Sequence, residues 1–309
     1  MSYRFKDDDE SLAAGMRRIA GDQIGRALRS IADAAEDRAE AVHDVRKRCK
    51  KLRGLIRLVR PGFAGYAPEN AAFRDIAKSL AGARDADALI DSYDLVADHY
   101  HHQIDRHAIA SVRQRLTRDR KALAKEDDSA ALLAAARAQL LAARERVRGW
   151  AIDGDEVEAL RGGLHKSYKR GVKAMAQARR TGDPADFHEW RKRCKYHWYH
   201  LRLIRDAWPA PLTARAGEAS ALSDLLGHHH DLAVLRGVLA GEPERYGRAE
   251  DVELLVGLID RRGAVLAARA TGLGARLFGE APDAMAERIA GYWRVWRDEG
   301  VAHRVALAE

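Results

Sequence analysis

The sequence predicts an all-α protein, and two observations carry this prediction. Ala and Leu are abundant, β-branched residues are scarce and only 6% of residues are aromatic, a bias that favours helix over strand. Apolar residues also recur at helical spacing along almost the whole chain. At 309 residues the chain is long enough to form one large or two modest domains, each able to bury its own core.

Helical periodicity predicts the same plan in each half of the chain. In the first half the expected helices cover about residues 10–36, 39–60, 69–82, 86–104, 106–125 and 129–148. In the second half they cover about residues 155–179, 184–206, 211–227, 229–240, 247–272 and 281–298. Segments rich in Pro and Gly separate them. Asp183 before Pro184 is a good N-cap with proline at the first helical position.

Two of these helices are strongly basic and share one motif. Residues 43–60 read HDVRKRCKKLRGLIRLVR, with eight Lys or Arg side chains and one acid, and residues 188–205 read HEWRKRCKYHWYHLRLIR, with six and one. The rest of the chain is mildly acidic, because the formal net charge of the whole is only +8. Positive charge focused in this way indicates a polyanion partner.

A second pair of segments repeats at nearly the same offset. SLAGARDADAL at 79–89 lies 145 to 146 residues before LLGHHHDLAVL at 225–235, and the basic motifs are 145 residues apart. Two pairs of segments in one register indicate an internal duplication. The predicted halves are residues 1–150 and 151–309, each a helical bundle.

On a helical projection each basic segment has a basic face opposite an apolar stripe. Cys49 and Cys194 fall on the apolar stripes, where a free cysteine acts as a small hydrophobe, and two cysteines make no disulfide framework. Like charges at these spacings repel, so a merely solvated helix mixes the two signs. Both basic faces nearly lack acids, which favours a ligand over simple solvation.

The two basic segments resemble the CHAD domain, the conserved histidine α-helical domain. The resemblance rests on an H-x-x-R-x-x-x-K core in both copies, each followed by a Gly-x-x-(x)-Asp segment, and it extends to the opening YRFKDDDESLAAGMRRIAGDQIGRAL. It implies a tandem pair of four-helix bundles related by a pseudo-twofold axis, with the basic helices lining a central pore or groove. It also implies that the ligand is inorganic polyphosphate.

The site residues that the resemblance implies fall mainly on the two basic faces. They are Arg18, His43, Arg46, Lys47, Lys50, Arg53, Arg57, Lys169, His188, Arg191, Lys192, Lys195 and Arg202. Trp198 stands where many members of the family keep a basic residue, so the second half is expected to contribute less charge and more wall. Tyr199, on the same face, is a candidate hydrogen-bond donor to phosphate.

Nucleic acid is the main alternative ligand. The same positive charge can grip a phosphate backbone, and Trp190, Trp198 and Tyr199 are candidates for stacking on bases. Against this, Trp190 falls on the apolar side, and a narrow pore excludes duplex DNA by its width. The choice between the two ligands depends on whether the basic faces enclose a pore or form an open surface.

Other chemistry finds less support in the sequence. The histidines at 99, 102 and 228–230 make no complete three-ligand set on one face, so no metal site is predicted and they are interpreted as surface or capping residues. No P-loop follows His43 or His188, which argues against phosphohistidine chemistry. The basic helices carry no inward acids to hold Mg²⁺, so a binding protein without cofactor is expected rather than an enzyme.

The cellular setting follows from composition and from the resemblance. No apolar run approaches the ~18 residues of a membrane span, and the acidic N-terminus does not resemble a secretory signal. A cytoplasmic protein is therefore expected. The resemblance adds an expected association with polyphosphate granules, where polyphosphate-metabolising enzymes would act in trans.

Overall fold

The computed structural model describes residues 3–35, 37–80, 85–103, 106–123 and 128–306, and every regular element within them is a helix. These helices are α1 (Leu12–Ala32), α2 (Arg38–Leu58), α3 (Tyr66–Ser79), α4 (Asp85–His99), α5 (Arg106–Leu123), α6 (Ser129–Val147), α7 (Glu156–Thr181), α8 (Pro184–Leu203), the 3-10 helix η2 (Arg205–Ala207), α9 (Pro209–Gly241), α10 (Pro243–Tyr246), α11 (Ala249–Leu277) and α12 (Pro282–Ala306). The predicted all-α class is confirmed. None of the described helices is both long enough and apolar enough to cross a bilayer.

One predicted helix boundary is wrong. The sequence indicated two helices, 211–227 and 229–240, whereas α9 is a single helix of 33 residues. A glycine inside a helix costs about 1 kcal/mol relative to alanine, so Gly227 weakens the local preference for a continuous helix. The buried face of α9 continues on both sides of this glycine, through Leu222, Leu226, Leu232 and Leu235. Tertiary packing of that face outweighs the local preference.

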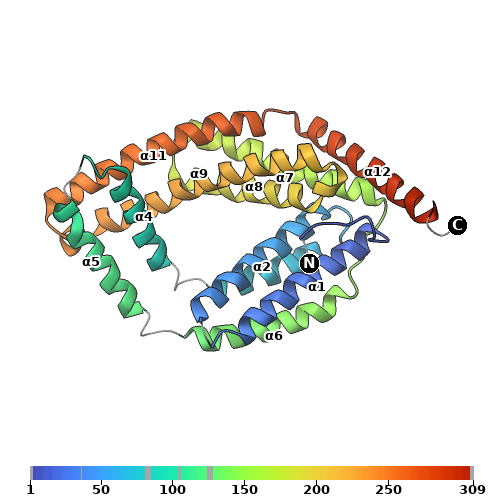
Figure 1. Ribbon diagram of the computed structural model, residues 1–309, viewed down its shortest axis with the longest axis horizontal. Helices are drawn as coiled ribbons and strands as arrows, with labels where there is room; N and C mark the ends of the chain where they lie inside the picture. The colour runs from blue at the N-terminus through green and yellow to red at the C-terminus, as the bar shows by residue number, and fades with distance from the viewer. Residues whose placement is uncertain (1–2, 36, 81–84, 104–105, 124–127, 307–309) are drawn as a thin grey trace.

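The buried apolar side chains form two cores, and both cores draw on both halves of the sequence. The larger core joins α1, α2, α3 and α6 to α7, α8, the first part of α9 and α12. The smaller core lies where α4 and α5 pack against the far ends of α9 and α11, away from α1 and α6 (Figure 1). The boundary predicted at residue 150 therefore does not separate the two buried cores.

The two basic helices cross closely near the centre of the molecule (Figure 1). A side chain on Gly54 of α2 would meet Cβ of Tyr199 in α8 at 3.0 Å, so a glycine at this position lets the two helices approach. The Nε2–H of His200 donates a hydrogen bond of 3.1 Å to the Gly54 carbonyl oxygen. The crossing holds α2 against α8 at Gly54, Tyr199 and His200.

Further contacts tie the ends of the two halves together. The carboxylate of Glu156, at the start of α7, accepts a 2.8 Å hydrogen bond from the backbone N–H of Leu12 at the start of α1. The N–H of Phe5 donates to the Leu203 carbonyl oxygen at 2.8 Å. Asp183 caps α8 as predicted, accepting a 2.8 Å hydrogen bond from the Ala185 N–H. A carboxylate at a helix N-terminus also interacts favourably with the helix dipole.

Two buried histidines in α8 make stability depend on pH. Burial lowers the pKa of His200 to about 3 and lowers the pKa of His197 as well. An unfolded histidine titrates near pH 6.5, so below that pH the unfolded state binds protons that the native state does not. We expect the free energy of unfolding to fall by about 1.4 kcal/mol per pH unit for each histidine as the pH drops from 6 to 5.

Urea unfolding at pH 7.5, 6 and 5 measures this loss. In the variant His200→Gln the amide keeps a donor for the Gly54 carbonyl but does not titrate. The decline with pH in this variant should be shallower than in the unaltered protein by the share of one histidine, about 1.4 kcal/mol per pH unit. Equal slopes for the two proteins would show that His200 is not the source.

Candidate functional site

The structure brings the duplicated basic positions together in one groove. A cavity of about 530 Å³ lies between α2, α8, α4 and α9. The first copy of the basic motif lines it with His43, Arg46 and Lys50, and the second copy with His188, Arg191 and Lys195. The same three motif positions therefore face one space from two helices that are far apart in the sequence. We call this cavity, with the α4 and α9 residues that wall it, the basic groove.

The core side of both helices holds these side chains in place. Val45, Cys49 and Leu52 of α2 are fully buried, as are Trp190 and Cys194 of α8. The apolar stripe predicted from the sequence is thus the buried face, and the basic stripe is left to face the groove. Burial raises the pKa of the Cys49 thiol to about 12, so this cysteine is an inert packing residue.

Desolvation and nearby positive charges disfavour the charged form of the two lysines of the groove. Burial lowers the pKa of Lys50 to about 8, and repulsion by Arg46, Lys195 and Arg191 adds to the effect. Burial also lowers the pKa of Lys195, followed by repulsion from Arg191. Each ammonium group in the empty groove is therefore destabilised relative to water. An anion that enters the groove removes this penalty.

Histidines are the second kind of titratable residue in the groove. The rings of His188 in α8 and His230 in α9 stack with centroids 3.8 Å apart and planes at 30°. Burial lowers the pKa of His188 to about 4, followed by repulsion from His230 and then from Lys192 and Arg191. His188 is neutral at pH 7 in the empty groove. A bound anion favours its protonated form, which donates from both ring nitrogens.

Gly227 makes room for one of the groove arginines. A side chain at this position of α9 would lie 3.1 Å from both Nε and Nη2 of Arg191. Glycine in the middle of this helix therefore serves the placement of a guanidinium rather than a turn. The equivalent glycine of the first copy, Gly82, lies outside the described residues.

Two predicted lysines lie outside the groove lining and pair with the motif's acids. In α2 the Nζ of Lys47 is 3.1 Å from a carboxylate oxygen of Asp44, and in α8 the Nζ of Lys192 is 3.1 Å from one of Glu189. Arg48 pairs with Asp44 at 2.9 Å, and its counterpart Arg193 pairs with Glu189. Each copy thus neutralises one flank of its basic face and leaves the groove residues to face one another.

Further along α2, Arg53 and Arg57 are held by polar partners. Arg57 is 8% exposed and donates 2.9 Å hydrogen bonds to the Tyr66 hydroxyl and to the Asn70 side-chain oxygen. Its guanidinium lies 4.4 Å from the ring centroid of Tyr196. Arg53 donates to the same Asn70 oxygen at 3.2 Å. These two arginines continue the basic stripe beyond the groove, but they do not line it.

The remaining predicted residues lie apart from the groove. Arg18 makes two hydrogen bonds of 2.6 Å to the Asp9 carboxylate, a bidentate pair that anchors the N-terminal segment to α1. Lys169 is exposed on α7 and does not line the groove. In α8 the guanidinium of Arg202 lies 4.8 Å from the Trp198 ring centroid.

Tyr199 does not reach the groove. It is 4% exposed, and its ring packs edge-on against Tyr3 with centroids 5.9 Å apart. The expectation that its hydroxyl donates to phosphate is therefore wrong. The close helix crossing at Gly54 places this ring in the seam between α2 and α8.

Sequence reasoning missed the opposite wall of the groove. Asp91 and Ser92 of α4, together with His228, His230 and Asp231 of α9, line the cavity. The repeated Gly-x-x-(x)-Asp segment was the available signal, since Asp231 belongs to its second copy. The interpretation of the histidine run as surface or capping residues is wrong for His229, which is 8% exposed. Across the described part of the chain, no three His, Cys, Asp or Glu residues are grouped to hold a metal ion.

Replacing Gly227 with alanine tests how the groove places Arg191. Gly227→Ala gains helix propensity but displaces the guanidinium, so we expect a smaller gain in unfolding free energy than from Gly237→Ala. Gly237 has no neighbour within 4 Å of an added Cβ, and its change to alanine should gain about 0.5–1 kcal/mol.

Calorimetry with tripolyphosphate, a short polyanion, measures the effect on binding. Gly227→Ala should weaken binding roughly tenfold, the loss of one charge-assisted hydrogen bond of about 1.5 kcal/mol. Gly237→Ala should bind as the unaltered protein does. Identical affinities in the two variants would contradict this role for Gly227.

Comparisons with known proteins agree with this geometry. The model of the CHAD domain family matches residues 18–240, which include both basic helices and both walls of the groove. Among solved structures, the crystal structure of the CHAD domain from the plant Ricinus communis is similar, with a TM-score of 0.62 and 20% sequence identity. The similarity covers 89% of this chain and 95% of that one and concerns the fold. No curated protein matches the sequence.

Proposed function

Because the chain belongs to the CHAD domain family, which is associated with polyphosphate, we propose that it binds inorganic polyphosphate in the basic groove without transforming it. One observation carries the proposal. The three duplicated motif positions of α2 and of α8 line a single cavity between two walls. A receptor for a chain of identical charged units requires such a dense cationic surface and needs no groups that read bases.

The chemistry of the groove residues suits phosphate oxygens. Arg46 and Arg191 can each donate two hydrogen bonds to neighbouring oxygens, while Lys50 and Lys195 supply compact charges. Burial lowers the pKa values of both lysines and repulsion adds to the effect, and a bound polyanion offsets the repulsion. Counterion release adds to the driving force, as it does for nucleic acids, so binding should weaken steeply with salt.

Nucleic acid is the rival ligand. Stacking on bases needs exposed aromatic rings, but Trp190 and Tyr199 are buried, at 0% and 4% exposure. Trp198 is only partly buried, and the Arg202 guanidinium lies over its ring at 4.8 Å. The cationic side chains line a walled cavity of about 530 Å³. These observations favour a thin flexible polyanion over a duplex.

The proposal extends to the role of the protein in the cell. We assign it a binding function at polyphosphate granules in the cytoplasm, with polyphosphate-metabolising enzymes acting in trans.

The two acids of the groove wall, Asp91 and Asp231, come from α4 and α9 rather than from the basic helices. Incubation with polyphosphate and Mg²⁺ should release no inorganic phosphate. Steady phosphate release would make the protein an enzyme.

Calorimetry with long-chain polyphosphate at two salt concentrations tests the proposed binding. We expect tight, salt-sensitive binding that duplex DNA and single-stranded RNA do not displace. The double variant Arg46→Glu/Arg191→Glu should lose at least about 100-fold in affinity, since two charge-assisted contacts of about 1.5–3 kcal/mol each are replaced by repulsion. A fluorescent fusion carrying the same substitutions should leave the granules.

The double variant Lys47→Glu/Lys192→Glu is a matched control for this experiment. It changes the net charge by the same amount on the same two helices. Its effect should be smaller, because these lysines pair with acids outside the groove lining. Equal losses in the two variants would mean that total charge, and not the groove, determines affinity. Stronger binding to nucleic acid would replace the proposal with its rival.

The lowered pKa of Lys50 makes binding depend on pH. With a pKa of about 8 in the empty groove, Lys50 loses its proton as the pH rises above 8, whereas a bound polyanion holds the proton on. Affinity should therefore fall by up to about tenfold between pH 8 and 9, with proton uptake on binding. Calorimetry in two buffers of different ionisation enthalpy counts the protons.

The variant Lys50→Arg provides the control, because arginine stays charged throughout this range. Its affinity should change less between pH 8 and 9, and its binding should take up fewer protons. Identical pH profiles for the variant and the unaltered protein would show that Lys50 does not titrate in the groove.

A further inference from the structure

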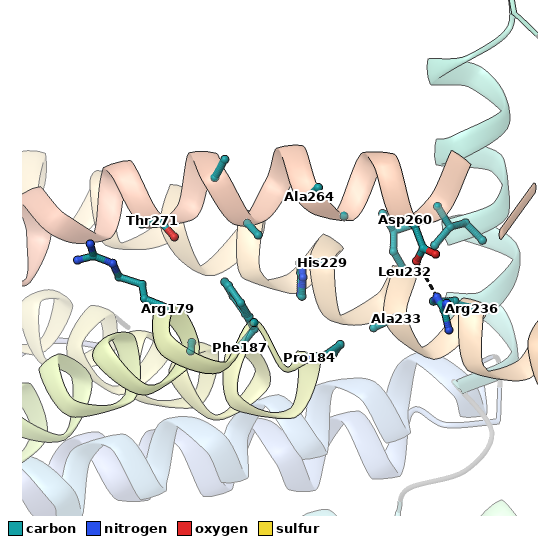
Figure 2. Close-up of a pocket in the computed structure, with 16 residues that line it drawn as sticks. Arg179, Pro184, Phe187, His229, Leu232, Ala233, Arg236, Asp260, Ala264 and Thr271 are labelled. Atoms are coloured by element: carbon teal, nitrogen blue, oxygen red, sulfur yellow. Dashed lines mark hydrogen bonds and ion pairs between the residues drawn. The ribbon is translucent and has the colours of Figure 1, made fainter. Parts of the chain in front are cut away.

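A second cavity lies behind the basic groove, on the other side of α9. It measures about 430 Å³ and is enclosed by the turn between α7 and α8, by α9 and by α11 (Figure 2). This size lies within the range of small-molecule sites, roughly 300–1,000 Å³. None of the residues that form the basic groove lines it except Leu232. We call it the rear pocket.

The floor of the rear pocket carries a buried histidine. His229 of α9 is 8% exposed and lies between Phe187 and α11 (Figure 2). Its Nδ1 is buried and has no hydrogen-bond partner. Burial lowers the pKa of His229, with a smaller contribution from His230, so the ring is neutral. A buried polar atom without a partner costs about 1–3 kcal/mol.

The walls of the rear pocket are apolar, and its ends are basic. The ring of Phe187 packs partly over the ring of His229, with centroids 4.6 Å apart and planes at 35°, so the two form one aromatic stack in the wall of the pocket. Small side chains of α11, such as Ala267, leave the facing wall open. Arg179 stands at one end of the pocket and Arg236 at the other (Figure 2).

The two arginines differ in their partners. Arg236 donates to the Asp260 carboxylate at 2.6 Å, which neutralises that end of the pocket. Arg179 is exposed on the last turn of α7, and among the described residues no ion pair engages it. The charge of the pocket is thus positive at the Arg179 end, next to an apolar and aromatic body.

From this geometry we propose that the rear pocket binds a small organic anion with a flat apolar body. The flat body lies against Phe187 and His229, where it displaces water from apolar surface. The anionic group pairs with Arg179 at the exposed end of the pocket. Flat organic anions include aromatic carboxylates and sulfonates.

The rear pocket and the basic groove lie on opposite sides of α9. His228 and His230 line the groove, whereas His229 between them lines the pocket, and Phe187 of the pocket directly precedes His188 of the groove. The two cavities therefore share a wall but not a ligand chemistry. The rear pocket lacks the cluster of cations that a polyphosphate chain requires.

Fluorescence of 8-anilinonaphthalene-1-sulfonate, a flat apolar anion, tests the proposal without polyphosphate. We expect saturable enhancement with one equivalent of probe per chain. Ala267→Leu fills the pocket and should abolish this enhancement, while Ala275→Leu, the same change at an exposed position of α11 outside the pocket, should preserve it. Circular dichroism and thermal unfolding confirm that both variants are folded.

A pair of probes isolates the charge. Arg179→Ala should weaken binding of the sulfonate about threefold, the effect of one exposed ion pair, and leave binding of the neutral N-phenyl-1-naphthylamine unchanged. Equal enhancement in Ala267→Leu and the unaltered protein would place the probe elsewhere and overturn the site. Equal loss of both probes in Arg179→Ala would overturn the assignment of an anionic ligand.

Discussion

The close crossing of α2 and α8 is the constraint on which the rest of the structure depends. Because Gly54 of α2 has no side chain, α2 packs directly against Tyr199 of α8. Each helix buries its apolar stripe in one continuous core. The basic faces, on the opposite sides of the two helices from these stripes, cannot move apart. Arg46, Lys50, Arg191 and Lys195 must therefore share one groove, although burial, and then repulsion, lowers the pKa of both lysines. The apolar core holds the charges together and so supplies the free energy that a bound anion later recovers.

Ion pairs on the flanks of the two basic helices limit the electrostatic cost of bringing their cations together. Asp44 and Glu189 occupy the same position in the two copies, and each pairs with the lysine and the arginine on its own flank. The lysine pairs are partly exposed and contribute little stability individually, about 0–1 kcal/mol, whereas the Arg48–Asp44 pair is largely buried. Their effect is on geometry, because they draw four cations away from the groove. The motif therefore contains both the charges that face the ligand and the acids that keep the others from adding to the repulsion.

The sequence was sufficient to predict what depends on local periodicity. The helical class, the two basic faces and the burial of Cys49, Cys194 and Trp190 all follow from a 3.6-residue period. Structural features that depend on contacts between distant segments could not be predicted from the sequence. The continuity of α9 through Gly227 depends on the packing of its buried face against other helices, and the burial of Tyr199 depends on the crossing at Gly54.

The same limit applies to individual charges. A periodic pattern placed Lys47, Lys192 and the groove residues on one basic face, because it cannot show which acid each cation meets. Arg18 is a similar case, since its partner Asp9 lies in the N-terminal segment that folds back on α1. The wall formed by α4 and α9 was visible only as a repeated Gly-x-x-(x)-Asp segment. Its role as the far side of the groove appears only in three dimensions.

The two copies of the motif have diverged in their electrostatic surroundings. The charges that shift the pKa of Lys50 are all cations, whereas Asp224 and Asp231 act on Lys195 and raise its pKa. The tryptophan at position 198 had suggested that the second copy contributes less charge, and the acids of α9 supply an independent reason. The pKa of Lys50 is therefore less influenced by nearby acids than the pKa of Lys195. If the groove binds a polyanion as proposed, the cations of the first copy supply more of the attraction, while the second copy, with α9, shapes the wall.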